Sequence, residues 1–329
     1  MQPSELRLTF IGPLAEYCTG LYAEKRALGY RYRSAGRLLQ ELDRFFLEQH
    51  AEPHALPKAL VQCWTTKRAH ERPRNHQFRV GGIRQLALFM VRQGVMAYVP
   101  PPLHLVAASQ QFTPYIFTQA EMRRLLQAAD QVRTFKNSPP GRAMMIAAAF
   151  RMLYGCGLRA SEVCRLRVQD VDLDAGVLTI RQTKFDKDRL VPTAPTLTTH
   201  LQVYAQSRLG TAEPTSYFFP APDHGPLCRA VLYAAFRQLL WVCGISHGGT
   251  GRGPRLHDLR HTFAVHCLQR WVRDGRDLST ALPVLSTYLG HNSLYGTQRY
   301  LRLTAELYPE ITAAVEAHFG QVIPERSDR

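Results

Sequence analysis

Three short segments of this 329-residue chain, and a tyrosine that follows them, place arginine, histidine and tyrosine where they could act together on a phosphate group. Planar guanidinium groups bind phosphate oxygens through paired hydrogen bonds, and histidine exchanges a proton near neutral pH. Each segment alone is weak evidence for a phosphate site. An arginine at the start of a helix, for example, is often simply solvated. The segments are Gly157 to Val163, Leu256 to Thr262 and Leu289 to His291, and Tyr300 follows nine residues after His291.

The role expected of each residue follows from the chemistry of phosphodiester cleavage. Attack on phosphorus builds negative charge on the non-bridging oxygens, and Arg159 and Arg260 are the expected clamp for that charge. His257 precedes Arg260 by one helical turn, so both can face the same phosphate, and His257 is suited to proton transfer. A tyrosine hydroxyl has a pKa of about 10 and attacks poorly at neutral pH without a base or a positive field. Attack by Tyr300 therefore requires arginines and histidines around it.

The order and spacing of these segments resemble those of the tyrosine recombinase (phage integrase) family, from about residue 115 to about residue 320. The resemblance implies a site-specific recombinase that cuts and rejoins DNA through a 3′-phosphotyrosyl intermediate, for integration, excision, resolution or transposition of a mobile element. It also implies that the chemical step uses no metal and no nucleotide cofactor. The implied catalytic residues are Arg159, Lys184, His257, Arg260, His291 and Tyr300.

The proton donor for the leaving group has two candidates. Breaking the P–O bond expels a deoxyribose 5′-oxygen that must be protonated, and the resemblance gives this role to Lys184, at the end of a predicted strand. The family often has glycine near this lysine, whereas this chain has Phe185. Lys187, in the polar turn that follows this strand, is therefore the alternative donor. The resemblance also implies that His291 adds a hydrogen bond to a phosphate oxygen.

Two further residues are expected to support the catalytic residues without contacting the phosphate. Glu162 follows Arg159 by three residues and is expected to orient an active-site base or to cap backbone, with a plain surface charge as the alternative. His261 points about 100° around the helix from Arg260, which favours support or packing over contact with the phosphate.

The composition indicates a folded protein whose surface attracts polyanions. The formal net charge is +15 and 45% of the residues are hydrophobic, enough for a sizeable core. Nucleic acid is the first expected partner. A membrane is the second, but no stretch approaches the roughly 18 consecutive apolar residues of a spanning helix. Seven scattered cysteines without metal-type pairs indicate reduced thiols, no structural zinc and a cytoplasmic location. The family resemblance implies a bacterial or phage protein that associates with the nucleoid.

Periodicity predicts a mainly α protein with a small β-sheet or hairpin. The two strands are expected at 176–181 and 189–191, and residues 271–283 look like an insertion of unassigned role. The expected domains are a helical one over 1–105, which resembles the family's core-binding (DNA-binding) domain, a linker over 106–115, and a mixed α+β integrase-type catalytic domain with a C-terminal helix over 116–329.

The expected partner is double-stranded DNA with specific recombination sites, held by basic surfaces of both domains. The resemblance implies a homo-oligomer, a tetramer on DNA, in which a C-terminal helix over 311–319 docks on a neighbouring protomer; packing on its own domain is the alternative. Accessory or related recombinase proteins can join this assembly. The competing functions are a type IB topoisomerase and a catalytically silent DNA-binding protein.

Overall fold

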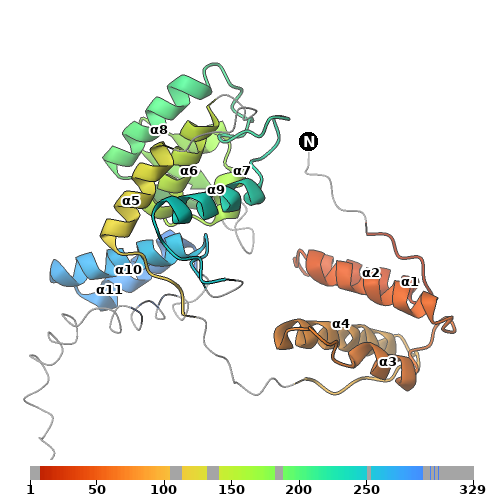
Figure 1. The fold of residues 1–329 in the computed structure, drawn as a ribbon. Helices are drawn as coiled ribbons and strands as arrows, with labels where there is room; N and C mark the ends of the chain where they lie inside the picture. Colours follow the sequence, from red (N-terminus) through yellow and green to blue (C-terminus); the bar gives the residue numbers. More distant parts are fainter. Residues whose placement is uncertain are drawn as a thin grey trace, which may run out of the picture. The chain divides into compact units, whose positions relative to one another are not determined.

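The computed structural model describes residues 8–103, 113–131, 141–181, 188–249, 253–291, 297, 300 and 303. The chain divides into two compact units, Met1–Phe112 and Thr113–Arg329, and each unit is treated separately below (Figure 1). Lys184, Lys187 and the predicted C-terminal helix over 311–319 lie outside the described residues.

The described part of the first unit is built from helices that pack through apolar stripes. These are α1 Ala15–Ala27, α2 Arg33–Glu48, α3 Lys58–Thr65 and α4 Pro73–Arg92. Helix α2 buries Leu38, Leu39, Leu42 and Phe46, whose spacing of one, three and four residues forms the apolar stripe of an amphipathic helix. Helix α4 carries Pro73 in its first turn, where the missing N–H costs no hydrogen bond.

A buried carboxylate joins the residues before α1 to helix α2. Asp43 is 1% exposed and accepts backbone N–H bonds from Ile11, Gly12 and Leu14 over 2.7 to 3.0 Å. Alanine would leave these donors without their charged acceptor, so we expect Asp43→Ala to lower the free energy of unfolding by about 3 kcal/mol in urea melts. Glu41→Ala, at an exposed position of the same helix, should change it by less than about 0.5 kcal/mol. Equal losses for the two variants would contradict this account.

The second unit combines helices with a small antiparallel sheet. Its elements are α5 Gln119–Asp130, α6 Arg142–Gly155, α7 Ala160–Arg165, the 3₁₀ turn η1 Val168–Asp170, β1 Val171–Asp172, β2 Val177–Ile180, β3 Arg189–Pro192, α8 Pro195–Arg208, α9 Arg229–Val242, α10 Asp258–Arg273 and α11 Leu278–Leu289. The strand order is β1-β2-β3, and Leu178 pairs with Val191. The predicted fold class, mainly α with a small β-sheet, is confirmed, and the short strand β1 adds to the two predicted strands.

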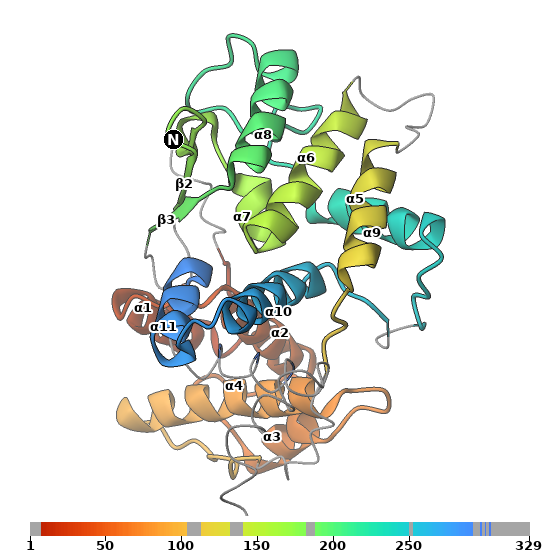
Figure 2. The ribbon, with the colours of Figure 1, turned by 90° about the vertical axis from the view of Figure 1, so that its left-hand side faces the viewer.

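Helix α6 forms the centre of the second unit. It buries every residue from Ile146 to Leu153 except Arg151, and it contacts α5, α8 and α10 (Figure 2). Phe150 stacks on Phe236 of α9 with ring centroids 6.2 Å apart. At the start of α5, Thr118 and Glu121 form a capping box, as their three-residue spacing favours.

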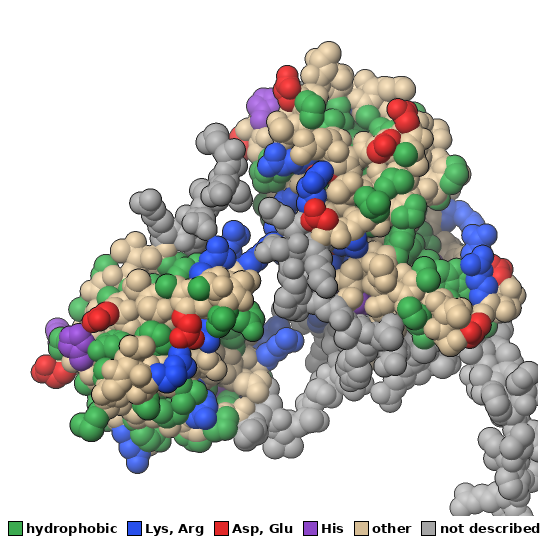
Figure 3. Space-filling model, turned by 180° about the vertical axis from the view of Figure 1, so that it is seen from behind, with side chains coloured by type: hydrophobic (Ala, Val, Ile, Leu, Met, Phe, Trp, Pro, Cys, Tyr) green, Lys and Arg blue, Asp and Glu red, His purple; other side chains and the backbone are tan. Residues whose placement is uncertain are grey.

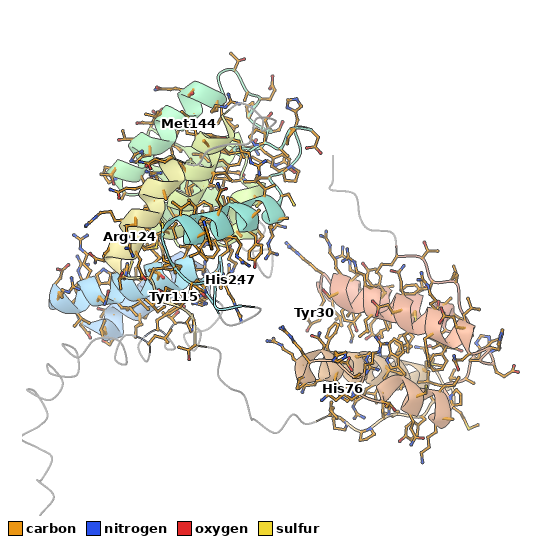
Figure 4. All side chains as sticks on the ribbon, viewed as in Figure 1. Tyr30, His76, Tyr115, Arg124, Met144 and His247 are labelled. Atoms are coloured by element: carbon orange, nitrogen blue, oxygen red, sulfur yellow. The ribbon has the colours of Figure 1, made fainter. Side chains whose placement is uncertain are left out.

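Helix α10 is tied to the residues that precede α5. The backbone N–H of Phe117 donates to the Thr262 hydroxyl over 3.1 Å, and Tyr115 lies beside the same helix (Figure 4). The predicted insertion over 271–283 forms the end of α10, a turn and the first half of α11. Asp277 caps this half by accepting the backbone N–H of Ser279 over 2.8 Å. The segment therefore builds the helix that leads to His291.

Candidate active site

The described motif residues come together from three places in the second unit. Arg159 immediately precedes α7, His257, Arg260 and His261 lie in the first turns of α10, and His291 follows the end of α11. Arg260 links the three places, since its Nη1 donates to the carbonyl oxygen of Gly157 over 2.8 Å and its Nη2 to that of Leu289 over 2.5 Å.

The end of helix α11 holds three arginines. The last carbonyl groups of a helix have no partner within the helix and carry the negative end of its dipole, so cations bind them well. Three consecutive carbonyl oxygens are occupied here: Tyr288 by Arg189 Nε at 2.9 Å, Leu289 by Arg260 Nη2 at 2.5 Å, and Gly290 by Arg159 Nη2 at 3.1 Å. The two arginines of the predicted clamp are thus positioned by the same helix end that precedes His291.

The turn from α11 into His291 explains the Leu-Gly-His motif. Gly290 ends the helix with φ 66°, a conformation that side chains with a Cβ rarely adopt. The N–H of Gly290 bonds to the carbonyl of Thr287 and that of His291 to the carbonyl of Ser286, both over 2.9 Å. A Cβ at Gly290 would also lie 3.0 Å from Arg189 Nη1, so glycine admits the arginine as well as the turn.

Glu162 is a buried carboxylate that neutralises part of the arginine charge. Its two oxygens accept the backbone N–H and Nη1 of Arg159 over 2.9 and 2.8 Å, and both terminal nitrogens of Arg189 over 3.0 and 2.9 Å. Burial by itself raises the pKa of Glu162, but the hydrogen bonds and charges of Arg189 and Arg159 lower it to about 2. The carboxylate therefore stays ionised at neutral pH and orients both guanidinium groups, and it also caps the backbone of Arg159, one of the roles expected from the sequence.

Arg260 is 1% exposed, which is unusual for a charged side chain. Burial, and then the neighbouring charge of Arg159, lower the pKa of Arg260 to about 10, so it remains a cation at neutral pH. Gly157, whose carbonyl accepts from Arg260, leaves room for the ring of Phe263, because a Cβ at Gly157 would lie 2.5 Å from a ring carbon of Phe263.

Two of the motif histidines are neutral at pH 7. Loss of water around the rings, followed by the charges of Arg260 and Arg159, lowers the pKa of His257 and of His291 to about 4 each. The positive charge that would meet a phosphate therefore comes from the arginines among these residues. The His291 Nδ1 lies 2.8 Å from the hydroxyl of Thr297, which orients the ring.

Tyr300 is 2% exposed and lies between two histidines. Its hydroxyl is 3.0 Å from Nδ1 of His261, and its ring stacks on His291 with centroids 6.0 Å apart and an interplanar angle of 22°. The role of His261 therefore goes beyond packing, because its ring nitrogen contacts the Tyr300 hydroxyl. Because its side chain leaves α10 about 100° from Arg260, it faces the position that Tyr300 takes from a later part of the chain.

Arg189 is the site residue that the sequence reading missed. Its side chain is 9% exposed, and it connects Glu162 to the end of α11. The strand pattern could have indicated its role. Side chains alternate along a strand, so Arg189 shares a face of β3 with the buried Val191. An arginine on the buried face of a strand needs a charged partner, and here that partner is Glu162.

We expect Arg189→Ala to slow the proposed DNA-cleavage step about 10-fold, because Glu162 would keep only one of its two arginines and Tyr288 would lose its donor. The measurement is the rate of covalent adduct formation at saturating DNA. Arg181→Ala is the matched control, since Arg181 stands in the same hairpin and pairs with Asp170 instead. Arg189→Lys should recover little, because an ammonium cannot make the fork of bonds to both partners. A rate for Arg189→Ala equal to that of Arg181→Ala would refute this positioning role.

Among the residues that the structure describes, no group of three or more His, Cys, Asp or Glu side chains could hold a metal ion. All seven cysteines are free thiols. Within the described parts of the chain, no helix is long and apolar enough to span a bilayer.

Comparisons with known proteins identify the family of the chain. The profile described as the phage integrase family matches residues 116–306. A putative integrase/recombinase, y4rB, of Sinorhizobium fredii is 33% identical over 295 residues, which cover 89% of this chain and 93% of the relative. Tyrosine recombinase XerA of Thermococcus kodakarensis is 31% identical over 193 residues, 59% of this chain and 60% of the relative.

Among solved structures, the integrase of transposon Tn1549 in complex with a circular intermediate DNA has a similar fold. Its TM-score is 0.61 at 17% sequence identity, with 86% of this chain and 94% of that chain covered. Fold and sequence together define a helical, integrase-type protein. The chain belongs to the phage integrase family of tyrosine-type site-specific recombinases.

Proposed function

We propose that this protein recombines DNA at specific sites by forming a 3′-phosphotyrosyl bond through Tyr300. The observation that carries the proposal is the convergence of Tyr300, His261 and His291 on the helix end that also positions Arg159 and Arg260. These residues are the parts that attack on a phosphodiester requires, namely a nucleophile, groups that exchange protons and cations for the developing charge.

In the proposed reaction, Arg159 and Arg260 bind the non-bridging oxygens of the scissile phosphate. The Tyr300 oxygen attacks phosphorus as the bond to the 5′-oxygen breaks, and His291 donates a hydrogen bond to a phosphate oxygen. His257, as a neutral imidazole, contacts the same phosphate through a hydrogen bond. Lys184, or Lys187 in the same segment, protonates the departing 5′-oxygen. The bond energy is kept in the phosphotyrosyl link, so religation with another strand needs no nucleotide.

The proposed partner is double-stranded DNA that carries recombination sites. Lysine and arginine side chains lie on the surface of both units (Figure 3), and the net charge of +15 favours phosphate contacts. In this proposal, residues 1–105 form the core-binding domain, 106–115 the linker and 116–329 the catalytic domain. Protomers assemble as a tetramer on DNA, with accessory or related recombinases where the element requires them. A bacterial or phage mobile element is the proposed setting, consistent with relatives that are named integrases.

The test is capture of the covalent intermediate without knowledge of the target site. The full chain is incubated with duplexes that carry a central nick and a randomised segment, in the presence of EDTA. Adducts that resist denaturation are recovered, the DNA is sequenced, and the modified peptide is identified by mass spectrometry. The proposal expects an enriched sequence and a modified Tyr300. Tight binding without an adduct would indicate a silent DNA-binding protein, and relaxation of plasmids regardless of sequence would indicate a topoisomerase.

A further inference from the structure

We propose that His261 is a catalytic residue, the group that accepts the proton of the Tyr300 hydroxyl as it attacks. The inference rests on the proposed function, because it concerns the same nucleophile. The carrying observation is the 3.0 Å separation between Nδ1 of His261 and the Tyr300 hydroxyl oxygen. This distance lies within the reach of about 2.6 to 3.2 Å expected of a general base.

The burial of Tyr300 makes a protein acceptor necessary. Only 2% of this residue is exposed, so bulk water has little access to the hydroxyl. A phenolic proton leaves with difficulty at neutral pH, since the ordinary pKa of tyrosine is about 10. A base held against the hydroxyl removes the proton during attack instead of before it, which avoids a free phenolate in the site.

The other two histidines of the site are less suited to this role. Next to Arg260 and Arg159, the pKa of His257 and of His291 falls to about 4, which disfavours uptake of a proton at neutral pH. The Nδ1 of His291 also lies 2.8 Å from the Thr297 hydroxyl, and its ring meets Tyr300 face to face. His261, by contrast, places its Nδ1 at 3.0 Å from the hydroxyl oxygen of Tyr300.

His257 contributes by positioning the acceptor. Its ring stands edge to face against that of His261, with centroids 4.8 Å apart and an interplanar angle of 84°. Both side chains lie at the start of α10, four residues apart and therefore on neighbouring turns. The contact fixes the plane of the His261 ring, so that Nδ1 stays directed at Tyr300.

The proton and electron balance of the step is simple. His261 carries its own proton on Nε2 and uses the lone pair of Nδ1. The Tyr300 O–H bond breaks, the proton moves to Nδ1, and the phenolic oxygen forms the bond to phosphorus while the bond to the 5′-oxygen breaks. That oxygen takes a proton from the leaving-group acid. In religation, the His261 imidazolium returns its proton to the departing Tyr300 oxygen.

The experiment compares three histidine variants on a duplex recovered by adduct capture, with cleavage measured in a single turnover at saturating protein. His261→Ala removes the acceptor, and we expect adduct formation about 100-fold slower. His261→Asn keeps an oxygen near the position of Nδ1 but cannot take up a proton near neutral pH, so it should be as slow as alanine. His266→Ala is the matched control, because His266 lies on the same helix and its Nδ1 is 2.8 Å from another tyrosine hydroxyl, that of Tyr154.

A second substrate separates the two proton transfers. A duplex with sulfur in place of the bridging 5′-oxygen has a leaving group that departs without a proton. Variants of His261 should remain slow on it, whereas a variant of the leaving-group lysine, Lys184→Ala or Lys187→Ala, should recover.

Three outcomes would overturn the assignment. One is a His261→Asn variant that forms the adduct at a rate within about threefold of the wild type, which would reduce the role of His261 to a hydrogen bond. The others are a His261→Ala variant that is equally fast, and recovery of the His261 variants on the sulfur substrate. Failure of the wild type to form any adduct would remove the proposed function and this assignment with it. Adducts that depend on Tyr300 but not on His261 would remove this assignment alone.

Discussion

Replacing Tyr300 with phenylalanine is expected to abolish covalent adduct formation while the affinity for DNA stays within about twofold of the wild type. The change deletes the one oxygen that can bond to phosphorus at this position, and nothing else in the described site could replace it there. The ring would remain stacked on His291, because that contact does not use the hydroxyl. The measurement is the fraction of nicked duplex that becomes attached to protein, next to a binding titration at the same salt concentration.

The control for this variant is Tyr154→Phe. It also removes a hydroxyl that bonds to a histidine of α10, since the Tyr154 hydroxyl lies 2.8 Å from Nδ1 of His266. We expect normal adduct formation from it. An adduct that persists in Tyr300→Phe would show that another tyrosine attacks, and peptide mapping would then identify it.

The second large effect is expected at Arg260. Alanine at this position removes a buried cation that the proposed mechanism uses for charge on the phosphate, so we expect adduct formation to slow between about 100-fold and 1000-fold. It also leaves the carbonyl oxygens of Gly157 and Leu289 without their donor, and the free energy of unfolding should fall by about 2 kcal/mol. Rates are therefore compared at a temperature where circular dichroism shows both proteins folded.

Arg270→Ala gives the matched control for Arg260→Ala. It removes the same charge from the same helix, but the Arg270 side chain is 83% exposed, and its Nε lies 3.8 Å from the half-exposed carboxylate of Asp274. Its rate and stability should stay close to those of the wild type. Arg260→Lys should behave like Arg260→Ala in rate, since one ammonium cannot span both carbonyl groups and a phosphate. A fast Arg260→Lys variant would mean that charge alone, without the guanidinium fork, suffices at this position.

Local patterns in the sequence predict many of the elements of the fold. The stripe of Leu38, Leu39, Leu42 and Phe46, the Thr118 capping box and the strand pair around 176–191 depend on residues that are neighbours in the chain. Side-chain spacing, cap chemistry and alternation act over a few residues, so the sequence alone predicts them.

The motif residues form the second part that the sequence could determine. Arg159, His257, Arg260, His291 and Tyr300 were selected by type and order, and the described structure brings them to one place. The structure, in turn, explains the two glycines beside the arginines, because positive φ and close approach of a side chain exclude a Cβ there.

Only the tertiary structure decided which groups touch. The bond from Arg159 to Gly290 spans 131 residues and that from Arg189 to Tyr288 spans 99, and no local rule pairs residues at such separations. The place of His261 against Tyr300 depends in the same way on where the chain after α11 returns to α10, 39 residues from its partner. The sequence by itself determined the family and most of the residues for the chemistry. Their roles toward one another follow from the packing of α7, β3, α10 and the end of α11, which brings side chains far apart in the chain into contact.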